Sequence, residues 1–458
     1  MAEGRPALRR VFVANRGEIA RRIIRAAHAL GMETVLAASA ADRDSLPARE
    51  ATRTVVIGPA AARASYLDAR LLVHAAKSTG CDALHPGYGF LSERAEFARL
   101  CEDAGLVFVG PRAETIGRIG DKLAARALAR EAGVPIVGGS DKVDSVDDAL
   151  HIAADIGYPV ITKASAGGGG RGMLVAPDAA SLAAGFDRAA NEAREAFGDG
   201  TLFLERYVER ARHVEVQVVG DGAGHVLHFG ERDCSIQRRY QKMVEEAPAA
   251  ILPENMRARL HAAAVTLLAG IQYRNAGTVE FLYDADRATF SFMEVNARIQ
   301  VEHPVSEAIT GVDLVCLQLQ VAAGMGLPAA QHAIRAHGHA IEMRVIAEDP
   351  DRDFAPSPGR IAHFRPPHGA GIRVDTAMAD GAMVPPYYDS MIAKLIVHGA
   401  DRAQAVDRLR GALDAFAIDG IATNLKLLRA IAAHPDFIAN RLDTRWMERT
   451  LLPAWRAR

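Results

Sequence analysis

Apolar and polar residues recur with clear periods along this chain, and the period changes from one segment to the next. An apolar run at residues 10–14 predicts a buried strand, helical spacing follows up to Leu30, and a second apolar run lies at 34–38. Further strands are predicted at 81–84 and 106–109. A strand–helix–strand order of this kind is typical of a doubly wound α/β domain.

A helix is predicted at 121–132, and a compact unit follows it. Strands at 159–163, 172–175 and 201–205 are predicted around a glycine-rich loop and a helix at 179–197. The small size of this unit and its flanking turns indicate a lid subdomain.

The rest of the chain, from Tyr207, is rich in strand-like segments. We predict strands at 213–219, 225–231, 243–246, 277–283, 340–347 and 392–397, and helices at 254–271, 313–323, 403–416 and 424–433. Together the regions predict a multidomain protein of the α/β and α+β classes.

The run from Phe290 to Pro304 (FSFMEVNARIQVEHP) carries an unusual set of polar residues. They all fall on even positions: Glu294, Asn296, Arg298, Gln300 and Glu302. In an extended backbone, side chains two residues apart point to the same side, so this set would share one face. A solvated outer face is the plainer alternative, but it does not explain why carboxylates and an arginine are mixed there.

Glu280, Glu294 and Asn296 form an all-oxygen set, which suits Mg²⁺ held against the phosphates of a nucleotide. Glu280 lies on the preceding predicted strand. A two-residue turn at Ala285 and Asp286 would place the two carboxylates on opposite faces. Only an odd-length or bulged loop brings both to one ion, and we predict the odd loop.

Composition and charge exclude several classes of protein. The 458 residues include 54 basic and 56 acidic side chains, so no overall field favours nucleic acid or an anionic membrane. The 4 cysteines are far apart and form no CxxC pair, which favours free thiols in a reducing compartment. No stretch approaches the roughly 20 apolar residues of a membrane helix. A cytoplasmic enzyme is the simplest prediction.

The sequence KASAGGGGRG at 163–172 is typical of a loop whose backbone N–H groups fold over phosphate oxygens. Lys163, at the end of the preceding strand, would add a positive charge for the same phosphates. The alternative is a flexible linker, but linkers are usually rich in serine and lack a lysine fixed on a strand. The loop is not a Walker A motif.

Three further features leave two interpretations open. Glu205, between apolar residues, is either structural or an acceptor for an adenine amino group. The basic stretch at 231–248 is either a solvated turn or a source of inward-facing cations. Arg344 lies inside an apolar strand, so it must be paired or meet an anion.

A series of motifs occurs in order along the chain: ANRGEIARR, HPGYGFLSE, KASAGGGGRG, RHVEVQV, ERDCSIQRR, QKMVEEAP, MEVNARIQVEHPVSE, EDP and PPYYDSMIAKL. In combination they closely resemble the biotin carboxylase family of the ATP-grasp superfamily, over roughly residues 8–450. The resemblance implies an N-terminal Rossmann-like domain at 1–119, an ATP-grasp domain at 120–336 with a lid at about 136–206, and a C-terminal domain at 337–458.

The resemblance also implies an activity: carboxylation of biotin with ATP and bicarbonate, through carboxyphosphate. It implies ATP contacts from Lys122, Lys163, Gly168, Gly169, Glu205, Val208, His213, Gln237, Tyr240, Glu280 and Glu294. Mg²⁺, with Mn²⁺ as an alternative ion, would be held by Glu280, Glu294 and Asn296. Bicarbonate would be gripped by Lys242, Arg298, Gln300 and the backbone of Val301. Glu302 would be the general base, Arg344 would stabilise the enolate oxygen of biotin, and Tyr88 would line the biotin pocket.

The chain departs from the family pattern at a few positions. Tyr240 stands where members usually carry histidine or asparagine, Ala166 replaces a usual loop glycine, and Ala297 sits where threonine or proline is commoner. None of these changes removes a catalytic group. We therefore expect the chain to be active. ATP affinity and lid closure are the properties in which it would differ from other members of the family.

The expected partners follow from the same resemblance. Because the chain has no AMKM-type biotinylation motif, we expect the biotin to reside on a separate carrier protein. Carboxyltransferase subunits and a homodimer are expected, without nucleic acid or membrane. The acyl acceptor is not determined by these residues; acetyl-CoA, with a role in fatty acid biosynthesis, is our prediction. The alternatives are a catalytically altered nucleotide-binding regulator and another ATP-grasp ligase.

Overall fold

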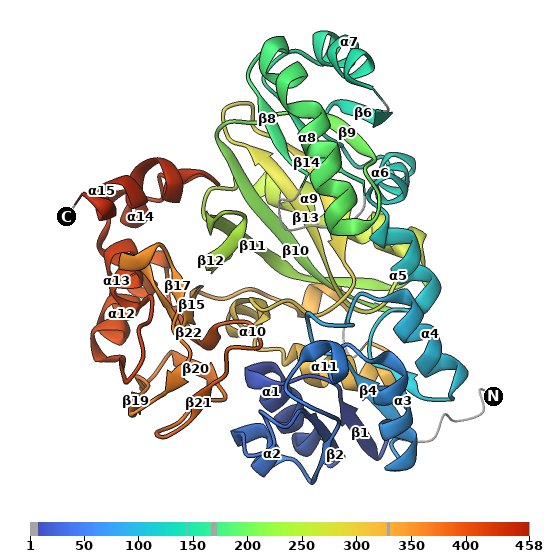
Figure 1. The fold of residues 1–458 in the computed structure, drawn as a ribbon, viewed down its shortest axis with the longest axis vertical. Helices are drawn as coiled ribbons and strands as arrows, with labels where there is room; N and C mark the ends of the chain where they lie inside the picture. The colour runs from blue at the N-terminus through green and yellow to red at the C-terminus, as the bar shows by residue number, and fades with distance from the viewer. Residues whose placement is uncertain (1–7, 144, 166–171, 328–329, 458) are drawn as a thin grey trace.

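The computed structural model describes residues 8–143, 145–165, 172–327 and 330–457, which form a mixed α/β protein with three main sheets (Figure 1). The N-terminal part lies at the bottom of the view, a small lid with α7 and α8 lies at the top, and the C-terminal part lies on the left. The predicted fold class is confirmed.

The N-terminal sheet is parallel, with strand order β3-β2-β1-β4-β5. Its strands are β1 (Arg10–Val13), β2 (Glu33–Ala38), β3 (Arg53–Val56), β4 (Ala83–His85) and β5 (Val107–Phe108), and its helices include α1 (Gly17–Ala29), α2 (Leu46–Glu50), α3 (Ala69–Ser78) and α4 (Ala95–Asp103). The order reverses between β1 and β4, so the loops after these two strands open at a switch point where α/β sheets bind ligands. The doubly wound prediction is confirmed, although β3, α3 and α4 were not predicted.

The lid has its own antiparallel sheet and its own core. The strands follow the order β6-β9-β7-β8, with bounds β6 (Gly139–Val143), β7 (Val160–Ala164), β8 (Leu174–Ala176) and β9 (Leu202–Arg206). Helices α7 (Val146–Ile156) and α8 (Ala179–Phe197) pack together on this sheet. Asp178 caps the start of α8 and Gly198 ends it in a left-handed conformation, so α8 has the predicted bounds.

The largest sheet has the order β14-β13-β10-β11-β12-β15-β22-β20. Its strands are β10 (Ala211–Asp221), β11 (Val226–Arg238), β12 (Gln241–Ala247), β13 (Arg274–Asp284), β14 (Thr289–Asn296), β15 (His339–Ile346), β20 (Ile372–Thr376) and β22 (Met391–Gly399). Strand β12 pairs with β15, so this sheet continues across the domain boundary predicted near residue 337. The predicted domain bounds remain a prediction.

The helices around this sheet connect the parts of the molecule. They are α5 (Ala113–Gly120), α6 (Lys122–Glu131), α9 (Glu254–Gly270), α10 (His303–Thr310), α11 (Leu314–Ala322), α12 (Arg402–Ala415), α13 (Leu425–Ala433), α14 (Pro435–Ile438) and α15 (Leu452–Arg456). Val305 and Ile309 of α10 pack on Ala247, Ala340 and Ile396 of the sheet. In the described residues no single helix is long and apolar enough to cross a membrane, and α10 with α11 meets that test only as a pair bent by 97°.

The hairpin of β13 and β14 corrects one prediction. Asp284 pairs with Thr289, so the loop between them has four residues, 285–288, and the predicted odd-length loop is wrong. The odd residue is Met293 instead, inside the strand: Phe281 pairs with Phe292, whereas Glu280 pairs with Glu294. Met293 forms a β-bulge, and this bulge brings the two carboxylates to the same face.

Candidate active site

A cavity of about 560 Å³ lies where the N-terminal loops, the large sheet and the C-terminal part meet. Most of the predicted catalytic and substrate residues line it: Tyr88, His213, Tyr240, Lys242, Glu280, Glu294, Asn296, Arg298, Gln300, Val301 and Arg344. They come from segments that lie hundreds of residues apart in the chain. The structure therefore places these predicted residues around one cavity.

The predicted metal ligands face one another at one side of this cavity. Asn296 Nδ2 donates to Glu280 Oε1 at 2.9 Å, and His213 Nε2 lies 2.9 Å from Glu280 Oε2. Burial raises the pKa of Glu280, but the charges of Lys242 and His213 outweigh it and hold that pKa well below its ordinary value. Burial and the neighbouring Glu280 carboxylate raise the pKa of Glu294.

These two carboxylates and the Asn296 amide fit a divalent cation of the Mg²⁺ type. Carboxylate and amide oxygens are the ligands that Mg²⁺ prefers, and Glu280 and Glu294 are direct cross-strand partners. A cation between the two carboxylates would offset the burial and the repulsion from Glu280 that raise the pKa of Glu294. Lys122 lies 3.9 Å from Glu294 Oε2, close enough to meet a phosphate at the same edge.

The predicted anion site is held by Arg298 and its neighbours. Arg298 Nη1 donates to Gln300 Oε1 at 2.7 Å, and Arg298 Nε donates to Glu93 Oε2 at 2.9 Å. Arg298 Nη2 also donates to Asn296 Oδ1 at 3.1 Å. These contacts fix the guanidinium plane beside the metal ligands, which is the arrangement needed to hold a small anion next to a nucleotide phosphate.

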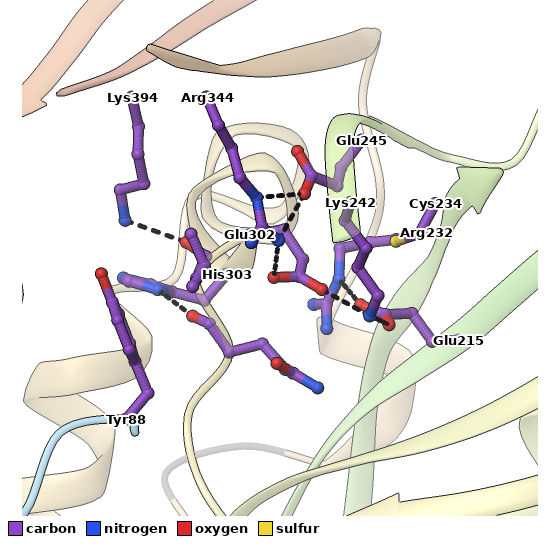
Figure 2. Close-up of polar contacts among 12 residues, drawn as sticks. Tyr88, Glu215, Arg232, Cys234, Lys242, Glu245, Glu302, His303, Arg344 and Lys394 are labelled. Atoms are coloured by element: carbon purple, nitrogen blue, oxygen red, sulfur yellow. Dashed lines mark hydrogen bonds and ion pairs between the residues drawn. The ribbon is translucent and has the colours of Figure 1, made fainter. Parts of the chain in front are cut away.

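Glu302 is completely buried and lies between two cations (Figure 2). Lys242 Nζ donates to Glu302 Oε1 at 2.8 Å, and Arg344 Nη2 donates to Glu302 Oε2 at 2.9 Å. Burial raises the pKa of Glu302, but Lys242, Arg344 and Arg232 together hold it well below the ordinary value. Glu302 is therefore ionised and can accept a proton from a ligand that displaces one of these contacts.

Lys242 joins the metal side of the cavity to the Glu302 side. Its ammonium contacts Glu215 at 2.5 Å and Glu280 at 2.9 Å, in addition to Glu302. Although burial lowers the pKa of Lys242, the three carboxylates raise it well above its ordinary value. The lysine therefore stays charged and can meet an anion placed between the metal site and the base.

Some residues that are predicted to bind the nucleotide do not line the cavity: Lys163, Glu205 and Gln237. Lys163 Nζ donates to Glu205 Oε2 at 2.5 Å, and Arg126 also donates to the Glu205 carboxylate. The role predicted for that carboxylate, taking an adenine amino group, stays a prediction; in the structure each of its oxygens accepts from one cation. Gln237 Nε2 lies 2.8 Å from His213 Nδ1 and so orients that ring.

The remaining nucleotide predictions are Val208, Gly168, Gly169 and Tyr240. Val208 is half-buried after β9 and does not line the cavity. Gly168 and Gly169 lie outside the described residues, as does Ala166. Tyr240, by contrast, lines the cavity at the tip of the β11–β12 hairpin with 57% of its surface exposed, so its ring is free to meet a ligand.

The loop after β4 is held by a residue after β1. Asn15 Nδ2 donates to the carbonyl oxygens of Pro86 at 2.7 Å and Tyr88 at 2.8 Å. Gly87 between them has φ +63°, and a Cβ there would lie 2.8 Å from Asn15 Nδ2, so only glycine fits. This close packing sets the position of Tyr88, whose hydroxyl donates to Glu18.

Arg232 belongs to the basic stretch at 231–248, and its full burial favours the inward-facing interpretation; it donates to Glu215 at 2.6 Å and to Gln217 at 2.8 Å. Other residues of the site were not predicted from the sequence. Glu93 orients Arg298, and Lys394 is a buried cation behind Val301. A charged residue inside an otherwise apolar strand is the signal that marks Glu215 and Lys394 in the sequence, as it marks Arg344.

Comparison with known proteins agrees with this arrangement. Three family models match: "Biotin carboxylase, N-terminal domain" at residues 7–116, "Carbamoyl-phosphate synthase L chain, ATP binding domain" at 121–330 and "Biotin carboxylase C-terminal domain" at 342–449. Biotin carboxylase 1 of Bacillus subtilis is 47% identical over 96% of this chain and 98% of its own length.

Two further similar proteins are named for carboxylases of other substrates. The methylcrotonoyl-CoA carboxylase subunit alpha of Arabidopsis thaliana is 46% identical over 96% of this chain and 60% of its own length. The biotin carboxylase domain dimer of Hydrogenobacter thermophilus 2-oxoglutarate carboxylase, solved with MgADP, ADP and bicarbonate, has a TM-score of 0.93 and 46% identity. That match covers 96% of this chain and 97% of the solved chain.

Proposed function

Because the chain belongs to the biotin carboxylase family, we propose that its cavity performs the ATP- and bicarbonate-dependent carboxylation of biotin with the residues described above. The activity class is an ATP-dependent ligase. The observation that supports these roles is the position of Glu302, a buried carboxylate held by Lys242 and Arg344. Both of these cations line the cavity that also contains the metal-type oxygen set.

In the proposed first step, bicarbonate lies near Lys242 and Arg298 while Glu302 accepts its proton. A bicarbonate oxygen then forms a bond to the γ-phosphorus of ATP, and the bond from that phosphorus to ADP breaks. Glu280, Glu294 and Asn296 would hold Mg²⁺, which neutralises charge on the phosphates when bound. Lys242 and Arg298 restrain the anion, so proton removal raises its reactivity without releasing it.

In the second step, the bond between carbon and the bridging oxygen of carboxyphosphate breaks to give CO₂ and phosphate. The phosphate takes the proton of the biotin ureido nitrogen, and that nitrogen forms a bond to the carbon of CO₂. The negative charge that develops on the ureido oxygen requires a fixed donor. Arg344 is suited to this role because it lines the cavity, and because Glu245 accepts from its Nε at 2.7 Å and Glu302 from its Nη2 at 2.9 Å, which fixes the plane of the guanidinium.

The test is bicarbonate-dependent ATP hydrolysis with and without free biotin. We expect hydrolysis to require bicarbonate and to increase when biotin is added. A nucleotide-binding regulator would show neither dependence, and another ATP-grasp ligase would not respond to biotin. Hydrolysis without any response to biotin would contradict the proposed function.

We further propose a separate biotin carrier protein and carboxyltransferase subunits as partners, acetyl-CoA as the acyl acceptor, and a homodimer in the cytoplasm. These proposals are supported by the family resemblance. Because similar proteins are named for methylcrotonoyl-CoA and for 2-oxoglutarate, the identity of the acceptor needs a direct test. Biotinylated carrier and carboxyltransferase would be supplied with each acyl acceptor in turn, and product formation from acetyl-CoA alone is expected. Sedimentation would give the oligomeric state.

A further inference from the structure

Lys394 is a fully buried cation on β22 that none of the steps above uses. Its ammonium donates to the carbonyl oxygen of Val301 at 2.9 Å and lies 3.1 Å from Glu18 Oε1. Val301 and Glu18 both line the cavity, but they belong to different parts of the chain. Lys394 itself belongs to the C-terminal part. One buried group therefore joins three segments at the back of the site.

Lys394 and Arg344 are direct partners on neighbouring antiparallel strands. Like charges in this position repel each other, so each needs its own acceptor. Arg344 reaches Glu302 (Figure 2). Lys394 reaches the carbonyl of Val301, the residue before Glu302. The two cations thus hold two consecutive residues just before α10, one by its side chain and one by its backbone.

On the other side, Lys394 acts on the loop that carries Tyr88. The hydroxyl of Tyr88 donates to the same Glu18 oxygen that faces Lys394. Burial and the Glu18 carboxylate raise the pKa of Tyr88 well above its ordinary value, so the phenol remains a donor. The position of the Tyr88 ring at the cavity wall therefore depends on a chain of contacts that begins at Lys394.

The surroundings keep Lys394 charged. Burial lowers its pKa, but the neighbouring carboxylates, with Glu18 first among them, raise it above the ordinary value, and Asp375 Oδ2 lies 3.8 Å from the ammonium. A neutral side chain at this position would leave Glu18 buried without its cation and the Val301 carbonyl without its donor. Both losses would destabilise residues of the cavity wall rather than residues of the protein surface.

We propose that Lys394 is a positioning residue for the two substrates other than ATP: through Val301 it fixes the backbone that grips bicarbonate, and through Glu18 it fixes the Tyr88 wall that faces biotin. The proposal rests on the proposed function, because it takes the roles of Val301 and Tyr88 from it. Lys394 does not contact the metal-type residues Glu280 and Glu294, so ATP binding should be independent of it.

The test is Lys394→Met, which replaces the side chain with an unbranched apolar one that is one atom shorter and removes its charge and donors. In the biotin-stimulated ATP hydrolysis assay, we expect the KM for bicarbonate and the KM for biotin each to rise about tenfold or more. The KM for ATP should change by less than about twofold. Lys426→Met is the matched control, because Lys426 on α13 is 76% exposed and should leave all three constants unchanged.

The pattern of KM values separates positioning from a general structural role. If Lys394→Met raises the KM for ATP as much as the other two, or lowers kcat alone, the proposal is wrong. If the variant does not fold, Glu18→Gln carries the test, because it keeps the shape of the side chain and removes the carboxylate between Lys394 and Tyr88. It should raise the KM for biotin several-fold, and an unchanged value would overturn the proposal.

Failure of the proposed function would look different. In that case the wild-type protein itself would show no stimulation by biotin, and binding of bicarbonate and biotin to the wild type would be absent before any variant is compared. A stimulated wild type with an unchanged Lys394→Met variant would instead contradict only the role of Lys394.

Discussion

At the scale of single residues, the site is a set of buried charges that balance one another. Glu302 is ionised although it is completely buried, because Lys242 and Arg344 each donate to one of its oxygens. Breaking such a pair leaves a buried charge without a partner. Neutral substitutions that keep the shape therefore test chemistry with the least damage to the fold.

Glu302→Gln should abolish the stimulation of ATP hydrolysis by biotin, a loss of about 10²-fold or more, because the amide cannot accept the proton of bicarbonate. Binding of MgATP, measured by calorimetry, should remain close to that of the wild type, since the metal-type residues are unchanged. Glu254→Gln, with a side chain that is 84% exposed, is the matched control. Loss of ATP binding in Glu302→Gln would contradict the role as base.

Glu342 gives a second prediction at this scale. Among the described residues neither of its carboxyl oxygens has a hydrogen-bond partner, and burial together with the Glu245 and Glu302 charges raises its pKa well above the ordinary value. The folded protein therefore holds a proton that the unfolded chain releases as the pH rises. The contribution of this group to the free energy of unfolding is fully present below the ordinary pKa of a glutamate and is lost at higher pH.

Glu342→Gln removes this titration. The free energy of unfolding of the variant, relative to that of the wild type, should therefore increase as the pH rises from 4 to 8. Urea unfolding at several pH values measures the difference. A difference that is constant with pH would show that Glu342 is not protonated in the folded protein.

At the scale of elements, the bulge at Met293 decides which face each residue of β14 occupies. Before the bulge, Phe290 and Phe292 lie in the core, and after it, Glu294 and Asn296 face the cavity, although all four have even numbers. A shift of one residue reverses the face of every side chain that follows. The bulge therefore lets one strand serve both the core and the site.

An alanine inserted between Met293 and Glu294 should turn Glu294 and Asn296 away from the cavity and abolish Mg²⁺-dependent binding of ATP, measured by calorimetry. The matched control is an alanine inserted between Asp286 and Arg287, in the loop at the end of the hairpin, which leaves the pairing of β13 and β14 intact. Equal binding by the two insertions would show that Glu294 and Asn296 are not ligands.

At the scale of the whole molecule, the site exists only where three parts of the chain meet. The N-terminal sheet supplies loops at its switch point, the large sheet supplies the carboxylates, and the C-terminal part supplies Arg344 and Lys394. The lid, at the top of the view in Figure 1, carries Lys163 on β7. A ligand that contacts more than one of these parts should therefore stabilise the folded state of the whole protein.

MgATP should raise the unfolding temperature, because a ligand present at about 100 times its Kd adds about 2.7 kcal/mol to stability. Excess EDTA should remove most of this shift, since Glu280 and Glu294 would then face the phosphates without the cation. Thermal unfolding with ATP, MgATP and MgATP plus EDTA measures both effects. A shift by ATP that EDTA does not change would argue against the metal site.

Local periodicity predicted much of this architecture. The first two strands and α1, the bounds of α8, and the gathering of Asn296, Arg298 and Gln300 on one side all follow from spacing along the sequence. These features depend on neighbours only two to four residues apart. Strand β3 and helix α10 were not predicted, because β3 is half exposed and α10 begins inside the polar motif, where no simple period is visible.

The sequence alone determined the types of chemical group, their order and the strands that carry them, because these depend on residues close together in the chain. Only the tertiary structure decided that Met293 bulges, that Glu205 is held by Arg126 and Lys163, and that Lys394 meets Glu18. Each of these depends on groups far apart in sequence or on strand register. Such contacts form only when burial and pairing have brought the segments together, and no local pattern encodes them.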